Sequence, residues 1–436
     1  MKICRRFSLV LCILIILSLF PGCQKQDKDI SSAKVEQGIT LTLGHHESAL
    51  PKSGITEELA RDFEEETGIH IEFVTVPDAQ WRDLLKAQLS DGSAPDIFTV
   101  DSDPFSLYER IRPDINCIDL SSEEFVSRMD ASVLPAVSYQ NKVYGITFLG
   151  KKIWVYAYNK KIFKELGLQI PTTYEELKQV CQVIKDAGIT PMWQVPASSW
   201  HQVLPLFEIG PYYQSKDDGL YDKLNKNKLD IKDIPDLLKV LEEINEFADL
   251  GFYGEDYFGN TVDGVKQQFA EGKVAMTLQL IGWPNELISQ YPEMGGNVGI
   301  FLMPWADNQM VGINPVSNAF FGNANSEHKE EILQFFRFLA EHDNLQKRLD
   351  GDPNSLEICW PEIKSRYPQE YTDYLSQFKT GIVMQAGVSY VDSQWMEIGE
   401  DIERMYADLM TPSEVLVEIS SRREKLARMM NDPYWN

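Results

Sequence analysis

Hydrophobic residues recur along the chain with the period of a strand in some segments and the period of a helix in others, and the two kinds of segment alternate. Residues 39–45, 69–77 and 96–101 have strand character. Between the first two, the fourfold spacing of Ile55, Leu59 and Phe63 predicts a helix. Strands that alternate with helices in this way predict a mostly parallel sheet with helices on both of its faces. Binding groups in such sheets collect in the loops at the carboxyl ends of the strands.

The same alternation begins again near residue 150. Residues 144–160 contain two stretches with strand character around a Gly-Lys-Lys break. Thr173 and Glu176 then form a capping-box pattern ahead of an amphipathic helix. Strands and helices continue at residues 265–284, 298–305 and 326–349, and amphipathic helices close the chain. The pattern predicts two α/β lobes.

The first 22 residues differ from the rest. A basic start, MKICRR, precedes an apolar run of 14 residues, which is shorter than the roughly 20 residues that a membrane-spanning helix needs and suits a secretory signal. The run ends in FPGC, which resembles the lipobox of bacterial lipoproteins and predicts lipidation of Cys23, with residues 23–37 as a flexible tether. The alternative is an ordinary leader that is cleaved nearby and leaves a free thiol.

Composition narrows the classes of function. The formal net charge of -25 opposes binding to nucleic acid and to anionic lipid headgroups. Cys117, Cys181 and Cys359 belong to the folded part, and no C-x-x-C spacing joins them, so neither a zinc site nor a thioredoxin-like site is expected. Whether two of these three cysteines form a disulfide is left open. The sequence contains no cofactor-binding motif, so we expect the protein to bind no cofactor.

Five segments, taken in order, resemble the family 1 extracellular solute-binding proteins of ABC importers, the relatives of maltodextrin-binding protein. The segments are FEEETGIHIEFV with LLKAQLSDGSAPDIFTVDSD, the stretch from YGITFLGKKIWVYAYNK to AGITPM, QQFAEGKVAMTLQLIGWP, GIFLMPW, and SEHKEEILQFFRFLAEHDNLQKRL. Each segment is weak alone. Together they cover nearly all of residues 38–436.

The resemblance implies a periplasmic-binding-protein-like fold with two discontinuous lobes, joined by hinge strands, and a ligand cleft between them. The lobes would be residues 38–149 with 310–360 and residues 150–309 with 361–436. The family implies a monomer, held at the membrane by its lipid, that captures a solute and delivers it to ABC permease subunits. The solute expected from the resemblance is a neutral sugar or oligosaccharide.

Aromatic residues are the first candidates for the site that the resemblance implies. Trp283 matches the position where sugar-binding relatives stack an indole on a pyranose ring, and the alternative is a core tryptophan that caps the sheet. Trp395 matches a second stacking position, although Gly399 stands where those relatives carry an arginine. Trp200 and His201 occupy a loop that contributes a ligand clamp, with a surface loop as the alternative.

Strand alternation adds a further aromatic candidate. It sets Trp154, Tyr156 and Tyr158 on one face of a strand without saying which face is core, so we expect one of them, with Trp154 as the candidate, to line the cleft. Lys152 lies at the expected crossover where sugar-binding relatives use an acidic residue. This departure, like that at Gly399, leaves the identity of the sugar open.

Polar candidates follow the first and third strands. His46 and Glu47 come after the first strand, where the resemblance places ligand contacts. Asp101 and Asp103 end the third strand and could accept hydrogen bonds from sugar hydroxyls, or else cap a helix. A metal site at His45, His46 and Glu47 is not expected, because adjacent residues of a strand point to opposite sides.

Two other classes remain as alternatives. A surface receptor that reports ligand occupancy to a sensor kinase would have the same fold and site. A secreted carbohydrate-active enzyme is less favoured: Asp101 and Asp103 have the D-x-D spacing of metal-dependent glycosyltransferases, but three residues match by chance often, and no catalytic fingerprint such as G-x-S-x-G or H-E-x-x-H is present. We therefore expect a binding protein and not an enzyme.

Overall fold

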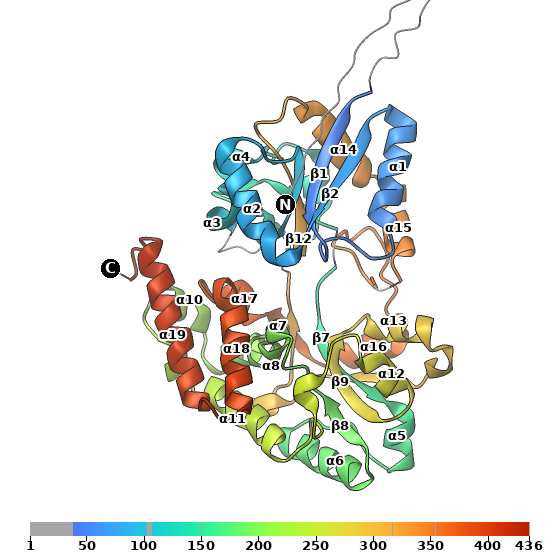
Figure 1. Cartoon of the computed structure of the whole chain (residues 1–436), viewed down its shortest axis with the longest axis vertical. Coiled ribbons are helices and arrows are strands. Elements are labelled where there is room, and N and C mark those ends of the chain that lie inside the picture. Colours follow the sequence, from blue (N-terminus) through green and yellow to red (C-terminus); the bar gives the residue numbers. More distant parts are fainter. Residues whose placement is uncertain (1–37, 103–106, 149, 316, 354, 436) are drawn as a thin grey trace, which may run out of the picture. The chain divides into compact units, whose positions relative to one another are not determined.

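The computed structural model describes residues 38–102, 107–148, 150–315, 317–353 and 355–435. The expected signal peptide, the tether and the lipidation at Cys23 lie outside these residues, as does Asp103. The described part of residues 39–436 contains two larger sheets, each with its own helices and hydrophobic core, and two small two-stranded sheets (Figure 1). The expected α/β fold is confirmed.

The first sheet has five strands in the order β2-β1-β3-β12-β6. They are β1 (Thr40–His46), β2 (His70–Val76), β3 (Ile97–Ser102), β6 (Gly145–Ile146) and β12 (Ser317–Gly322). Strand β1 pairs in parallel with β2 and β3, whereas β12 runs antiparallel to β3 and β6. The carboxyl ends of β1, β2 and β3 therefore meet the amino end of β12 at one edge.

Helices from two distant parts of the chain cover this sheet. They are α1 (Ile55–Thr67), α2 (Asp78–Asp91), α3 (Leu107–Ile111), α4 (Pro113–Asn116), α14 (Lys329–Leu339) and α15 (His342–Gly351). Phe63 of α1, one of the residues at fourfold spacing, packs against Phe335 and Phe338 of α14 with ring centroids 5.0 and 5.3 Å apart. The C-terminal half of the chain thus returns to complete the first core. A two-stranded hairpin, β4 (Ser138–Tyr139) and β5 (Lys142–Val143), follows α4, and 3-10 turns η1 (Glu124–Arg128) and η2 (Leu134–Val137) precede it.

The second sheet has the order β10-β7-β9-β8. Its strands are β7 (Trp154–Asn159), β8 (Thr190–Trp193), β9 (Val274–Leu280) and β10 (Val298–Phe301). Only β8 and β9 pair in parallel, because β7 runs antiparallel to both β9 and β10. The prediction of a mostly parallel sheet was wrong here: strand-like residues give spacing but not direction, and β7 enters this sheet directly from the first one.

Most of the described helices lie outside the first sheet, around the second one. They are α5 (Lys160–Glu165), α6 (Tyr174–Asp186), α7 (Ser199–Gln202), α8 (Leu204–Phe207), α9 (Gly210–Lys216), α10 (Leu220–Asn225), α11 (Pro235–Asp249), α12 (Val265–Ala270), α13 (Trp283–Gln290), α16 (Gln369–Leu375), α17 (Met384–Gly387), α18 (Trp395–Tyr406) and α19 (Pro412–Met429). Short 3-10 turns connect them: η3 (Ile231–Asp233), η4 (Tyr257–Gly259), η5 (Pro292–Met294), η6 (Trp305–Asp307) and η7 (Asp392–Gln394).

The predicted start of α6 is half a capping box. The Thr173 side chain accepts a hydrogen bond from the Glu176 backbone N–H, whereas the Glu176 carboxylate accepts from Thr172, one residue earlier than the motif requires. Cys181 lies on the buried face of this helix. Burial raises the pKa of the Cys181 thiol well above its ordinary value, and Cys117, Cys181 and Cys359 are all buried, free thiols.

The chain passes between the two sheets three times. The first crossover joins β6 to β7, the second leads from β11 (Met310–Ile313) to β12, and the third precedes α16. Strand β11 pairs in parallel with β13 (Lys379–Ile382), so the second crossover leaves the second lobe after Ile313. The backbones of Lys152 and Asn314 exchange two hydrogen bonds of 3.1 and 3.0 Å, which join the first and second crossovers.

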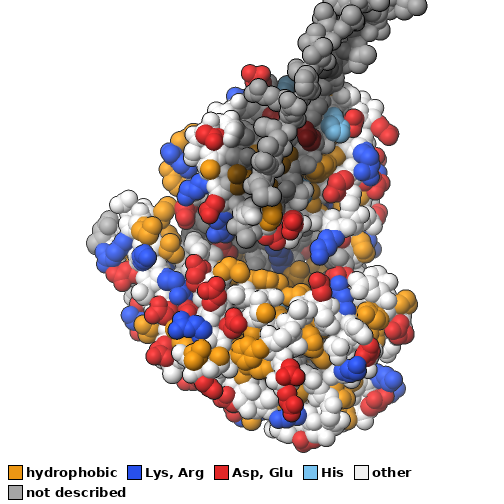
Figure 2. All heavy atoms as spheres, viewed as in Figure 1, with side chains coloured by type: hydrophobic (Ala, Val, Ile, Leu, Met, Phe, Trp, Pro, Cys, Tyr) orange, Lys and Arg blue, Asp and Glu red, His pale blue; other side chains and the backbone are white. Residues whose placement is uncertain are grey.

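Figure 2 shows acidic and basic side chains interspersed over the displayed face, without a broad basic area on it. Among the described helices, none combines the length and the apolar character that crossing a bilayer would take.

Candidate functional site

Three tryptophans gather at one edge of the second sheet. Trp154 begins β7 and lies opposite Leu280, the last residue of β9. Its ring centroid is 5.9 Å from that of Trp200 in α7, and the Trp395 indole N–H donates a 2.8 Å hydrogen bond to the Trp200 carbonyl oxygen. All three side chains are partly exposed. We call Trp154, Trp200 and Trp395 the aromatic shelf.

His201 lies beneath the aromatic shelf. Its side chain is buried, its ring meets those of Trp154 and Trp200 edge-on at 5.9 and 5.2 Å, and its Nε2–H donates to the Leu278 carbonyl oxygen at 3.1 Å. Burial lowers the pKa of His201 to about 4, so the imidazole is neutral at neutral pH. The surface-loop alternative for this residue was wrong: His201 supports the two indoles from below.

Trp395 reaches the shelf because α18 and α7 pack closely. Gly399 lies one turn after Trp395, and a Cβ atom there would overlap the carbonyl oxygen of Ser199 in α7. A side chain of any size would push the helices apart. The packing therefore gives a physical reason for the glycine that stands where sugar-binding relatives carry an arginine.

A second group of candidate residues lies at the carboxyl edge of the first sheet. His46 ends β1, Asp101 lies near the end of β3, and Asn318 of β12 is the register partner of Asp101. The Nε2 atom of His46 is 3.0 Å from Oδ1 of Asn318 and 3.7 Å from Oδ2 of Asp101. With Asp78, whose contacts follow, these residues form what we call the polar cluster.

Asp78 is a member of the polar cluster that the sequence did not single out. It begins α2, directly after β2 and Pro77, and its carboxylate accepts hydrogen bonds from Nδ1–H of His46 at 2.9 Å and from the N–H and hydroxyl of Ser48 at 3.0 and 2.9 Å. Partial burial works to raise the pKa of Asp78, but the hydrogen bonds from Ser48 and His46 outweigh it and lower the pKa below its ordinary value. The sequence signal that could have found Asp78 is its position directly after the second strand. Asn318 has no comparable signal in the sequence.

The other polar candidates are placed differently. Glu47 is exposed, and its backbone N–H donates to Val76 across the end of β2. The His45 ring is bonded outside the polar cluster: its Nδ1–H donates to the backbone carbonyl oxygen of His46, and its Nε2 lies 3.1 Å from the Thr75 hydroxyl. Within the part of the chain that the structure describes, no group of three or more His, Cys, Asp or Glu residues is arranged to hold a metal ion.

Trp283 does not lie on the shelf. It begins α13, its side chain is 6% exposed, and its ring meets Phe269 edge-on at 5.3 Å within a cluster that includes Ala157 and Val298. This is the core position that the sequence offered as the alternative to a ligand contact. We therefore leave Trp283 out of the site proposed below.

One ion pair links the surroundings of the two groups. Arg110 of α3 donates to the Asp101 carbonyl oxygen and forms a 2.5 Å ion pair with Asp392, three residues before Trp395. Asp392 lies in η7, which leads directly into α18. Arg110 therefore links the backbone of the polar cluster to the segment that precedes Trp395 of the aromatic shelf.

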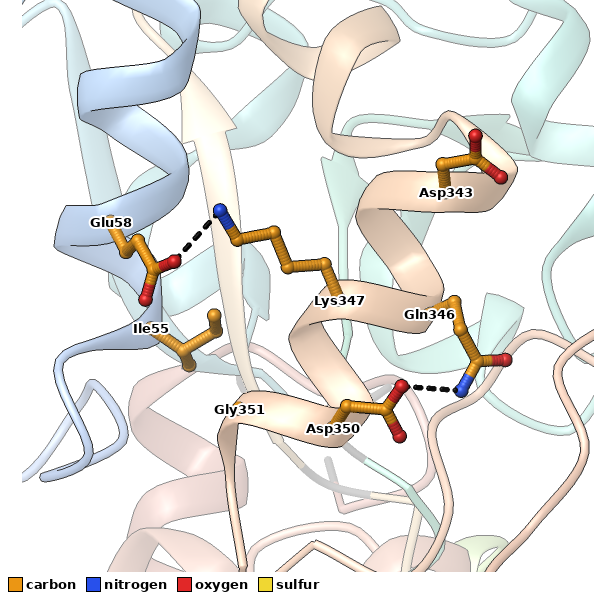
Figure 3. Close-up of a pocket in the computed structure, with 7 residues that line it drawn as sticks. All are labelled: Ile55, Glu58, Asp343, Gln346, Lys347, Asp350 and Gly351. Carbon is orange, nitrogen blue, oxygen red and sulfur yellow. Dashed lines mark hydrogen bonds and ion pairs between the residues drawn. The ribbon is translucent and has the colours of Figure 1, made fainter.

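A surface pocket of about 480 Å³ lies elsewhere, between α1 and α15 (Figure 3). Its single cation, Lys347, pairs with Glu58 at 2.8 Å and with Asp62 at 2.6 Å, and Gln346 bonds to Asp350. The cation is thus paired within the chain, and none of the residues that line the pocket is aromatic. We do not place the ligand there.

Comparison with known proteins decides the family. The profile described as "Bacterial extracellular solute-binding protein" matches residues 48–346. The chain belongs to this family. The relationship expected from the five sequence segments is confirmed, and the family is extracytoplasmic in location.

Individual relatives within the solute-binding family are distant. The "Multiple sugar-binding protein" of Streptococcus mutans is 22% identical over 78% of this chain and 79% of its own. Among solved structures, a "Chitin oligosaccharide binding protein" has a TM-score of 0.72 at 18% identity, covering 89% of this chain and 100% of its own. A Bacillus licheniformis sugar transporter in complex with stachyose has a TM-score of 0.70 at 18% identity, with coverages of 89% and 100%. These structures share the two-lobed fold.

Proposed function

We propose that this solute-binding protein captures a neutral oligosaccharide and delivers it to the permease subunits of an ABC importer. The observation that carries the proposal is the aromatic shelf, where three partly exposed indoles gather at the end of a sheet. A sugar ring has an apolar face of C–H groups that stacks on an indole, and an edge of hydroxyls that needs hydrogen-bond partners. The polar cluster supplies such partners.

Energetics favour a ligand that spans several contacts. A micromolar complex needs about 8 kcal/mol, whereas a stacked aromatic contributes roughly 1 kcal/mol and a neutral hydrogen bond roughly 0.5 to 1.5 kcal/mol. A ligand with several rings and many hydroxyls can use the whole shelf and the polar cluster. The names of the streptococcal relative and of the stachyose complex support the same class of ligand.

The proposal includes a location and excludes catalysis. We infer that Cys23 carries the lipid anchor, so that the protein acts as a monomer at the outer face of the cell membrane beside its permease. Its relatives are binding proteins, and we propose that this chain likewise leaves its solute chemically unchanged.

A ligand screen tests the function. We would titrate the purified protein with stachyose, a chitin oligosaccharide, monosaccharides and amino acids by thermal shift and calorimetry. A ligand at about 100 times its dissociation constant stabilises the fold by roughly 2.7 kcal/mol, which is measurable in a protein of this size. Chromatography of the ligand after incubation shows whether it is cleaved, and cleavage would overturn the binding-protein assignment.

Single substitutions then locate the site. Trp154→Ala and Trp200→Ala should each weaken the binding of an oligosaccharide hit. Trp193→Ala is the matched control, because Trp193 is also partly exposed at a strand end of this sheet but donates its indole N–H to Thr261 away from the shelf. Binding only of amino acids, or equal losses in all three variants, would contradict the proposal.

A further inference from the structure

A buried carboxyl group lies where the crossovers meet the second lobe. Glu208 directly follows α8, and its side chain is 1% exposed. The preceding residue, Phe207, packs against Trp395 of the aromatic shelf with ring centroids 5.9 Å apart. Glu208 is therefore one residue away from the support of the proposed site.

The hydrogen bonds of Glu208 use only one of its two oxygens. Its Oε1 accepts from Nδ2 of Asn314 at 3.2 Å and from Nε2 of Gln385 at 2.6 Å. Within the described residues, Oε2 of Glu208 and Oε1 of Gln385 are buried and have no hydrogen-bond partner. A buried carboxylate with one unsatisfied oxygen is costly, whereas a neutral carboxyl leaves no uncompensated charge.

One partner of Glu208 lies on the second crossover, and the other follows the strand that pairs with β11. Asn314 is the residue that pairs with Lys152 and so joins the first crossover to the second. Gln385 lies in α17, just after β13, which pairs with β11. One carboxyl group is thus bonded to two residues that lie 106 and 177 positions away from it along the chain.

Backbone packing shows that this junction is tight. A Cβ atom at Gly312 in β11 would overlap the carbonyl oxygen of Glu208, so the strand lies directly on this backbone. Gly312 is also the register partner of Gly381 in β13. The junction cannot adjust by small side-chain movements, and a change at Glu208 passes to the strands themselves.

We propose that Glu208 is a positioning residue, whose neutral carboxyl fixes the crossovers against the aromatic shelf and whose deprotonation loosens the solute site. The proposal rests on the binding function proposed above. No part of the argument requires Glu208 to touch the ligand. It acts through Asn314 and Gln385 on the hinge and through Phe207 on Trp395.

The surroundings of Glu208 determine in which direction its pKa shifts. Burial raises the pKa of Glu208 to about 8, against which the hydrogen bonds from Asn314 and Gln385 and the Lys152 ammonium favour the ionised form. From α10, the Tyr221 phenol faces the same region and donates to the Ile382 carbonyl oxygen. The neutral form is therefore expected at neutral pH, and the ionised form above the pKa.

The test is the pH profile of affinity, measured with stachyose or, if it does not bind, with the oligosaccharide hit of the screen. If only the neutral form is competent, about one molecule in eleven remains competent one pH unit above the pKa, and the apparent dissociation constant at pH 9 rises about tenfold. Glu208→Gln should bind as the wild type at pH 6.5 and show no such rise, because its amide keeps the acceptor and never ionises.

Glu243→Gln is the matched control. Glu243 is a second buried glutamate of the same lobe, and burial raises its pKa to about 7, but its Oε2 accepts from the Ala306 backbone N–H, outside the junction described for Glu208. This variant should keep the pH dependence of affinity. A flat wild-type profile, or a Glu208→Gln profile that rises like the wild type's, would overturn the proposal.

A ligand-free measurement separates this proposal from the function itself. Nitroxide labels at Asp343→Cys in α15 and Glu165→Cys in α5, both exposed, report the distance between the lobes. We expect the distance distribution to change between pH 6.5 and pH 9 in the labelled wild type and to stay constant with Glu208→Gln. If no sugar binds, the proposed function fails, but the distance measurement still tests the role of Glu208. A wild-type distance distribution that is the same at pH 6.5 and pH 9 would overturn that role.

Discussion

The indole N–H of Trp395 donates a 2.8 Å hydrogen bond to the backbone carbonyl of Trp200, which joins the first turn of α18 to the short helix α7. The two residues are 195 positions apart in the chain. Because the bond uses the edge of one indole and only the backbone of the other residue, it fixes both without using the ring faces. The shelf is thereby ordered before any ligand arrives, which lowers the entropy cost of binding.

Trp395→Phe should weaken binding of the oligosaccharide found in the screen. The change keeps an aromatic ring but removes the donor to Trp200, and a lost hydrogen bond of roughly 1 kcal/mol corresponds to about a fivefold loss of affinity. Calorimetry measures it. Trp283→Phe is the control: it should lower the unfolding temperature through its core contacts and keep the affinity. The opposite pattern would restore Trp283 as the ligand contact.

Gly399→Ala should disturb the same junction by a steric route. The added methyl group would overlap the carbonyl oxygen of Ser199, so α18 must move away from α7, at a cost of about 1 to 3 kcal/mol in unfolding free energy. Denaturant unfolding measures this loss, and the ligand affinity should fall with it. Gly259→Ala is the control, because no atom lies within 4 Å of a Cβ atom at Gly259. Equal stabilities of the two variants would refute the close-packing argument.

His201→Gln should change how stability depends on pH. The unfolded histidine has an ordinary pKa of 6.5 and the folded one a pKa of about 4, so between these values the unfolded chain binds a proton that the folded chain does not. The free energy of unfolding therefore rises with pH across this window, by roughly 3 kcal/mol from His201 alone. When the free energy of unfolding is measured at several pH values from 4 to 7, it should rise less steeply with pH in His201→Gln than in the wild type. Identical slopes would mean that His201 is not buried and neutral.

Local chemistry explains what could be predicted from the sequence. The strands near residues 40, 70 and 97 and the helix at Ile55 were placed because periodic burial leaves a periodic pattern. Strand alternation places Trp154, Tyr156 and Tyr158 on one face, and the prediction was that one of them, Trp154, lines the site. In the structure Trp154 is partly exposed, whereas Tyr156 and Tyr158 are buried.

The remainder depends on contacts between distant segments. Asn318 meets His46 across 272 residues, and nothing near Asn318 in the sequence marks it. The burial of His201 and Glu208 likewise results from how α7 and α8 pack under the shelf and against the crossovers. The direction of β7 is fixed by the passage of the chain from one sheet to the other. Periodicity cannot report any of these.

Asp78→Ala tests whether the polar cluster takes part in binding. The carboxylate holds His46 at the end of β1 and Ser48 just beyond it, and Ser48 contributes two of its hydrogen bonds. Because the Asp78 side chain is 56% exposed, its loss should cost at most about 1 kcal/mol of stability. We expect the affinity for the sugar to fall several-fold, since His46 loses the group that orients its ring. Calorimetry and thermal unfolding separate the two effects.

Asp91→Ala provides the comparison for this change. Asp91 ends the same helix, α2, and its carboxylate also accepts two hydrogen bonds from a serine, Ser93, at 2.9 and 2.6 Å, but it bonds to no residue of the polar cluster. Both variants remove one exposed carboxylate with serine partners, so they match in charge and in local hydrogen bonding. A loss of affinity in Asp78→Ala alone assigns the effect to His46 and its neighbours. Equal affinities in both variants and the wild type would remove the polar cluster from the site and leave the aromatic shelf as its only supported part.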